Sequence, residues 1–73
     1  MKKTSLGKSF YTTSSPIYIQ KELHKAFHLK YAEIVENNSD FPEMSLVTAI
    51  VICYEKDVED VLIFLNRFDC EKN

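Results

Sequence analysis

The feature that most constrains this chain is a change in apolar spacing between residues 16 and 34. Ile17 and Ile19 lie two positions apart, which is the period of a strand. The apolar residues that follow recur every three or four positions, which is the period of a helix. They are Leu23, Phe27, Tyr31 and Ile34. We therefore predict a short extended segment over residues 16–19 that passes directly into an amphipathic helix over residues 21–37.

A second helix is expected after the polar stretch at residues 37–40. Asp40 and Glu43 have the spacing of a capping box, and Pro42 fits the first helical turn. The run Leu46–Tyr54 that follows is apolar apart from Thr48. Its capping signals favour a helix, whereas its many β-branched residues favour a buried strand, so both alternatives remain open. Beyond it, apolar spacing over residues 58–68 predicts a helix, which is either separate from 46–54 or continuous with it. If 46–54 is a strand, residues 61–65 could instead be its hairpin partner.

The length of 73 residues limits the chain to one small domain. A helix that is apolar on every side must be buried on every side, which favours a homodimer. We expect a flexible basic arm over residues 1–15, a single helical domain over 16–70 and a tail over 71–73. Within the arm, Phe10-Tyr11 could instead pair as a strand with Ile17–Ile19 in a hairpin. The two cysteines, Cys53 and Cys70, are not in a CxxC pair, and no apolar run approaches the roughly 20 residues of a membrane span. A cytoplasmic protein that crosses no membrane is therefore the simplest interpretation.

Charge is distributed unevenly along the chain. Residues 1–31 contain six lysines and one acid, a net charge of +5, whereas residues 32–73 contain three basic residues and ten acids, a net charge of −7. A basic N-terminal half can attract a polyanion, although lysines near a chain start are also common in proteins without that function.

Residues suited to catalysis or metal binding are sparse. His24 and His28 have the i, i+4 spacing of a zinc-binding pair, but no third ligand accompanies them, so two surface histidines are favoured. Gly7 is the only glycine, which excludes a glycine-rich phosphate loop. The acids around Asp57–Asp60 fit the start of a helix better than an acid/base pair. We predict that the protein is not an enzyme and needs no cofactor.

The extended segment followed by Lys21-Glu22-Leu23-His24, and then by a second helix from Met44-Ser45-Leu46, resembles the ribbon-helix-helix DNA-binding proteins of the Arc and MetJ class. The resemblance covers residues 14–56. It implies a mainly α fold, with a short N-terminal strand followed by two or three helices, that forms an intertwined dimer. In that family the paired strands enter the major groove and read base edges.

The resemblance also implies which residues contact DNA. Tyr18 and Ser14 would face the groove, and Ser45 would lie near a backbone phosphate. The lysines of the arm would add attraction that does not depend on base sequence. The full set of expected DNA contacts is Lys2, Lys3, Lys8, Ser14, Tyr18, Lys21 and Ser45.

Two functions follow from these features. The first is a small dimeric DNA-binding protein that acts as a transcriptional regulator or as a plasmid or phage accessory factor. The alternative is a small helical module that binds another protein, as an inhibitor or adaptor of a larger enzyme, through its acidic C-terminal half and without binding DNA.

Overall fold

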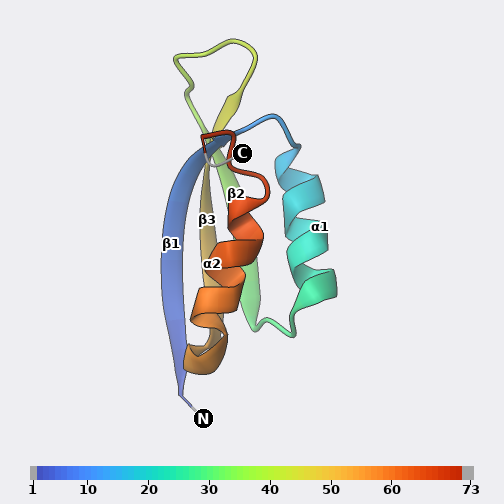
Figure 1. The fold of residues 1–73 in the computed structure, drawn as a ribbon, viewed down its shortest axis with the longest axis vertical. Helices are drawn as coiled ribbons and strands as arrows, with labels where there is room; N and C mark the ends of the chain where they lie inside the picture. Colours follow the sequence, from blue (N-terminus) through green and yellow to red (C-terminus); the bar gives the residue numbers. More distant parts are fainter. Residues whose placement is uncertain (1, 72–73) are drawn as a thin grey trace.

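Three antiparallel strands form a sheet whose central strand is the last in sequence (Figure 1). The strands are β1 (Lys3–Thr12), β2 (Tyr31–Asn37) and β3 (Ser45–Tyr54), arranged in the order β1-β3-β2. The computed structural model describes residues 2–71 of the chain. A helix connects β1 to β2, so β3 is inserted between two parallel strands joined by a crossover. The fold is α+β, and the expected mainly α, ribbon-helix-helix-like architecture is wrong.

The central strand β3 is the apolar run for which helix and strand were both considered. Val47, Ala49 and Val51 have no exposed surface, and the residues between them point to the opposite face. β-Branched side chains pack well on a pleated sheet and lose rotamer freedom in a helix. The predicted helix over this run is therefore wrong and the strand alternative is correct, and β1 and β2 flank the segment within one copy of the chain.

Residues 16–19 form the first turn of helix α1 (Pro16–Ala26), not an extended segment. Ser15 is the N-cap, because its side chain accepts a hydrogen bond from the backbone N–H of Tyr18, and Pro16 occupies the first helical position. Ile19 is fully buried, whereas Ile17 is 74% exposed. The predicted pairing of Ile17–Ile19 strands between two copies therefore has no structural basis.

Helix α1 ends at Ala26, whereas the predicted helix ends at residue 37. Phe27 is the C-cap, and its N–H donates to the carbonyl of Leu23 at 3.0 Å. The chain then turns into β2, where Ala32 and Ile34 are buried and the residues beside them face outward. The spacing that predicted one long helix therefore spans a helix, a loop and a strand.

A turn, not a helix start, separates β2 from β3. The N–H of Met44 donates to the carbonyl of Phe41 at 3.3 Å, which places Pro42 at the second position of a four-residue turn. After β3, the 3-10 turn η1 (Glu55–Asp57) leads into helix α2 (Val58–Asn66). The prediction of a helix after residue 57 is confirmed.

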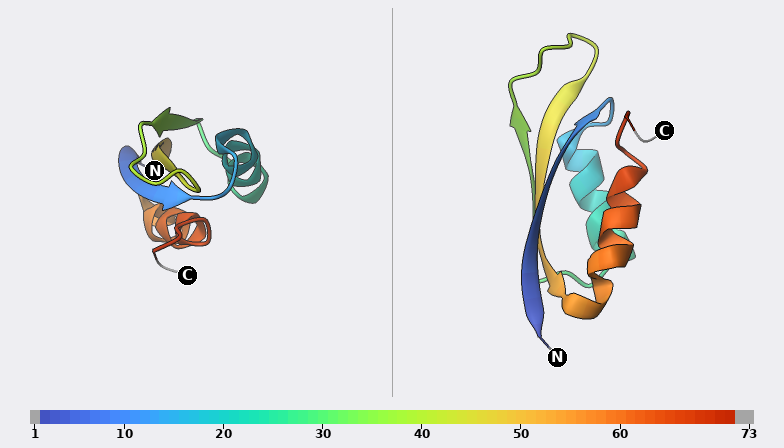
Figure 2. Two further views of the ribbon diagram at one scale, coloured as in Figure 1. Left: turned by 90° about the horizontal axis from the view of Figure 1, so that it is seen from above. Right: turned by 60° about the vertical axis from the view of Figure 1, so that its left-hand side comes forward.

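Both helices cover the same face of the sheet, as the right-hand view of Figure 2 shows. The rings of Phe27 and Phe64 meet edge to face with their centroids 5.6 Å apart, which links α1 to α2. The core lies between the helices and this face, which we call the covered face. It consists of Phe10, Ile19, Leu23, Ala32, Ile34, Val47, Ala49, Val51, Cys53, Val61 and Leu65.

The N-terminal residues are part of the sheet. Residues 3–12 form β1, where the sequence analysis expected an arm outside the fold. Residues 72 and 73 of the expected tail lie outside the described residues. Between residues 2 and 71, no helix is both long enough and apolar enough to cross a membrane.

Candidate functional site

No helix of residues 2–71 covers the face of the sheet opposite α1 and α2, and we call it the open face. Strand residues alternate between the two faces, so every second residue of each strand belongs to it. Its members are Lys3, Ser5, Gly7, Ser9 and Tyr11 from β1, Tyr31, Glu33, Val35 and Asn37 from β2, and Leu46, Thr48, Ile50, Ile52 and Tyr54 from β3.

One half of the open face carries a cluster of apolar and aromatic side chains. Tyr31 is opposite Ile52 in the β2–β3 register, and Ile50 and Tyr54 flank Ile52 along β3. Ile50 is 38% exposed and Tyr31 is 42% exposed. These four residues form the surface that we call the apolar patch. Antiparallel sheets with a solvated face usually carry polar residues there, so isoleucines at these positions are unusual.

Small residues on β1 keep the apolar patch open at one side. Ser5 is opposite Ile52 and Gly7 is opposite Ile50 in the β1–β3 register. Neither side chain is long enough to cover an isoleucine on the neighbouring strand. A partner side chain can therefore reach Ile50 and Ile52 from the direction of β1.

A polar row bounds the apolar patch on the side nearer the β2–β3 turn. The Thr48 hydroxyl is 2.8 Å from the Ser9 hydroxyl and accepts a hydrogen bond from Asn37 Nδ2 at 3.0 Å. These bonds join all three strands across the open face. They hold the side chains that border the patch in fixed positions before any partner binds.

A side-chain pair on β2 fixes the edge of the patch. The Tyr31 hydroxyl donates to the Glu33 carboxylate. This hydrogen bond, with smaller contributions from desolvation and from the charge of Glu33, raises the pKa of Tyr31 above its ordinary value. Tyr31 therefore presents a neutral, oriented ring to solvent at neutral pH.

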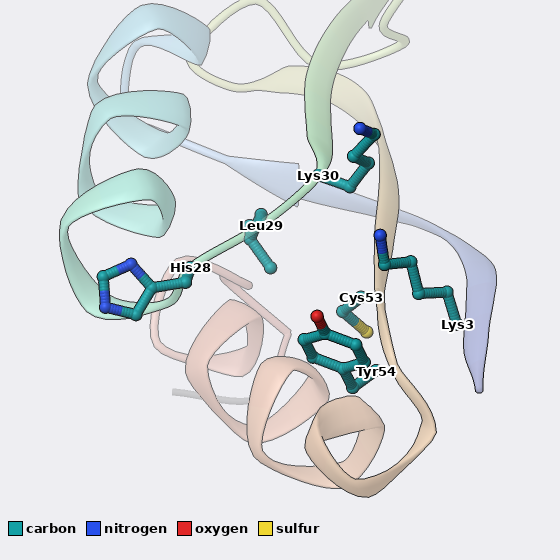
Figure 3. A pocket seen from close by; sticks show the side chains of 6 residues that line it. All are labelled: Lys3, His28, Leu29, Lys30, Cys53 and Tyr54. Carbon is teal, nitrogen blue, oxygen red and sulfur yellow. The ribbon is translucent and has the colours of Figure 1, made fainter. Parts of the chain in front are cut away.

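A basic hollow of about 260 Å³ lies at the end of the sheet next to the apolar patch (Figure 3). Lys3 and Lys30 enter it from opposite sides of β3, and the Lys3 ammonium lies 5.7 Å from the centre of the Tyr54 ring. No acidic residue is among those that line it, which favours an anionic group such as a carboxylate. Its lining consists of Lys3, His28, Leu29, Lys30, Cys53 and Tyr54.

Burial and electrostatics disfavour the reactive form of the cysteine that lines the hollow. Cys53 is only 3% exposed, and burial, followed by the nearby charge of Asp57, raises the pKa of its thiol. A thiol with a raised pKa is protonated at neutral pH, and the thiolate is the reactive form. Cys53 is therefore a small core residue.

The seven predicted DNA contacts do not form one surface. Tyr18 and Lys21 lie on α1, on the helix side of the sheet, while Lys3 lies on the open face. Tyr18 is 52% exposed and its ring meets Phe68 edge to face, with centroids 6.2 Å apart.

The remaining predicted contacts lie at other places in the fold. The N–H of Ser14 donates to Thr12 Oγ1 in the turn before α1, and Ser45 Oγ donates to Glu36 Oε2 at the start of β3. Lys8 projects from β1 toward the helix side. The carbonyl of Lys2 accepts a hydrogen bond from the N–H of Glu55 beside the opposite end of the sheet.

The histidine pair does not have the geometry expected of it. His24 is in α1, but His28 lies beyond the end of that helix in the loop to β2. The i, i+4 spacing therefore does not bring the two imidazoles onto one helix face. Within residues 2–71, no group of three or more His, Cys, Asp or Glu side chains could hold a metal ion.

The sequence analysis missed most of the open face. It placed Tyr31 in a helical core and treated residues 46–54 as buried on every side, so Ile50 and Ile52 received no role. The useful signal was present in β2, where Ala32 and Ile34 alternate with longer or charged residues. Comparisons with known proteins add no assignment: no family model, curated protein or solved structure matches the chain.

Proposed function

We propose that this protein is a non-enzymatic module that binds another protein through its open face. The proposal is supported chiefly by the exposure of Ile50 on the central strand and of Tyr31 on the adjacent edge strand, on a sheet face that no helix of residues 2–71 covers. Exposed apolar patches bordered by polar groups mark protein-binding surfaces, and aromatic residues contribute strongly to binding free energy at such surfaces.

The partner that fits this surface has an apolar centre and a neighbouring carboxylate. Its apolar side chains would pack on Ile50 and Ile52. They would reach these residues across β1, where Ser5 and Gly7 are too short to block access. Its carboxylate would enter the basic hollow beside Lys3 and Lys30. Such charge complementarity increases the association rate and fixes the orientation of the partner.

Protein is favoured over nucleic acid because the basic side chains are dispersed. The open face carries Lys3 but also Glu33, and Lys21 and Lys8 are directed elsewhere in the fold. Phosphate binding requires several cations on one surface. In addition, residues 16–20 form a helix, so they cannot pair into the ribbon through which the predicted DNA recognition would act. We also propose that the module acts in the cytoplasm, because Cys53 and Cys70 are free thiols.

Affinity capture with matched variants tests this proposal. An extract of the source cells is passed over immobilised wild-type protein and, separately, over immobilised Ile50→Asp and Ile63→Asp. The captured protein is then purified, and its affinity for each of the three is measured by titration. Ile63 is the matched control, because it is 58% exposed but lies on α2, away from the open face. We expect Ile50→Asp to weaken the measured affinity by at least tenfold, and Lys30→Glu to weaken it less. Ile63→Asp should leave it unchanged.

Two results would overturn the proposal. Equal affinity of the captured protein for wild type and Ile50→Asp would exclude the open face as its binding site. Retention of duplex DNA or single-stranded RNA at low salt that Ile50→Asp abolishes would show that the face binds nucleic acid instead.

A further inference from the structure

The outer edge of β1 carries unpaired backbone groups whose positions follow from one hydrogen bond. The N–H of Glu55 donates to the carbonyl of Lys2 at 3.0 Å, so residues 2 and 55 form a hydrogen-bonded pair of the β1–β3 ladder. Such pairs recur at every second residue of an antiparallel ladder. The even-numbered residues of β1 therefore bond to β3, and the odd-numbered residues direct their N–H and C=O groups outward.

A second hydrogen bond agrees with this assignment. The N–H of Cys70 donates to the carbonyl of Tyr11 at 2.8 Å, from the segment that follows α2. Tyr11 is odd-numbered, so its carbonyl is on the outer edge as the alternation requires. Among residues 2–71, this hydrogen bond occupies the outer edge of β1 at its Tyr11 end only. Within the same residues, the outward groups of Lys3, Ser5, Gly7 and Ser9 form a free edge along the rest of the strand.

We propose that two copies of this chain join their β1 edges antiparallel, which makes one continuous six-stranded sheet. The proposal is independent of the open-face function, because it concerns backbone groups at the edge of the sheet rather than side chains on its face. Long free edges pair readily with another strand, since each added strand satisfies a full row of backbone donors and acceptors.

The free groups determine the register of the joint. Only one symmetric antiparallel register uses all four free residues and leaves Tyr11 with Cys70: Lys3 opposite Ser9 of the second copy, and Ser5 opposite Gly7 of the second copy. Each of these pairs is hydrogen-bonded. The twofold axis then passes between Leu6 of one copy and Leu6 of the other, which form a non-hydrogen-bonded pair with Cα atoms about 4.5 Å apart.

The side chains at this joint can pack against the side chains that face them in the second copy. Leu6 is only partly buried in one copy, so contact with its counterpart removes further apolar surface from water. No lysine is directly opposite another lysine, because Lys8 is opposite Thr4 of the second copy.

Proline at position 7 tests the edge directly. Gly7→Pro removes an outward N–H without removing a β1–β3 hydrogen bond, and edge strands tolerate proline at such positions. Gly7→Ala is the matched control because it keeps the N–H, and its added Cβ meets nothing nearer than the Ala49 carbonyl oxygen at 3.9 Å. By sedimentation equilibrium, we expect wild type and Gly7→Ala to be dimers. Gly7→Pro should be a monomer with an unchanged circular-dichroism spectrum.

A cysteine cross-link tests the register, and it also covers the case in which Gly7→Pro fails to fold. In a Cys70→Ser background, Leu6→Cys should form an intermolecular disulfide on air oxidation, because the two Cβ atoms face each other across the axis. Ser9→Cys should not, since its two copies lie about 20 Å apart in this register. A monomeric wild type, a dimer that Gly7→Pro leaves intact, or equal cross-linking at positions 6 and 9 would overturn the proposal.

Discussion

Neighbouring residues along β3 lie on opposite faces of the sheet and differ in burial. Val51 is fully buried beneath the helices, while Ile50 and Ile52 point to the face that no helix covers. The two faces of the sheet are thus similar in composition along this strand but different in environment. The covered face gains its apolar contacts from α1 and α2, whereas the open face relies on small neighbours, a polar row and a basic hollow.

The difference shows which residues support the fold and which are available for binding. Burial of Val47, Ala49 and Val51 accounts for the stability that the central strand contributes. Ile50 and Tyr31 remain 38% and 42% exposed in a single copy, so burial within one chain explains their apolar character only in part. Binding of a partner that removes Ile50 and Tyr31 from water would explain why these exposed positions are apolar.

The largest expected effect comes from the same substitution on opposite faces. Ile34 is 8% exposed on the covered face of β2, and Ile50 is 38% exposed on the open face of β3. Ile34→Ala should lower the free energy of unfolding by about 2–5 kcal/mol, because it leaves a cavity in the core. Ile50→Ala should lower it by less than about 1 kcal/mol. Urea denaturation of the two variants measures both values, and equal losses would contradict the division into two faces.

A smaller effect is expected where α1 begins. Ser15→Ala removes the acceptor for the N–H of Tyr18 and should lower the free energy of unfolding by about 1 kcal/mol. Ser15→Asp keeps an acceptor at the N-cap and should lower it less. If both variants were as stable as wild type, the N-cap would not contribute to holding α1 on the covered face. The measurement is again urea denaturation.

The smallest effect concerns pH and compares one titrating group from each face. Burial raises the pKa of the Cys53 thiol in the folded state above the ordinary 9.0. Below pH 9.0, the protonated thiol therefore makes its full contribution to the free energy of unfolding. This contribution is lost as the pH rises past 9.0, because the unfolded thiol ionises first. In a Cys70→Ser background, replacement of Cys53 by Ala should therefore reduce the fall in stability above that pH. Tyr31→Phe should change the free energy of unfolding only near and above pH 10.0. Urea denaturation at several pH values distinguishes the contribution of Tyr31 from that of Cys53.

Part of this fold was predictable from particular residues. The acids of Glu59–Asp60 and the apolar spacing after them correctly predicted α2, because acids in the first turn and the apolar periodicity both indicate a helix there. For residues 46–54 both faces of the strand are apolar, so the period of two that distinguishes a strand is hidden. Capping residues near Asp40 then favoured a helix, although tertiary pairing with β1 and β2 decides this segment.

The error at residues 16–37 has a different physical origin. Ile17 and Ile19 alternate by coincidence, and the stronger signal was Ser15-Pro16, which is typical of a helix start. Tyr31 and Ile34 continued the helical spacing of Leu23 and Phe27 by chance across the loop. Because this shifted the strand and helix boundaries, the predicted DNA contacts fell on different elements, and the open face did not exist in the predicted fold.

Both proposals require β1 to pair with β3 in the observed register, and a nuclear Overhauser spectrum of the wild-type protein tests this pairing most directly. Non-hydrogen-bonded pairs bring backbone Cα atoms closest together, so their Hα protons should show strong cross-peaks. The structure predicts such cross-peaks between Ser5 and Ile52, Gly7 and Ile50, and Ser9 and Thr48. If residues 3–12 showed only sequential cross-peaks, they would be an arm outside the sheet, and both the open face and its β1 edge would be excluded.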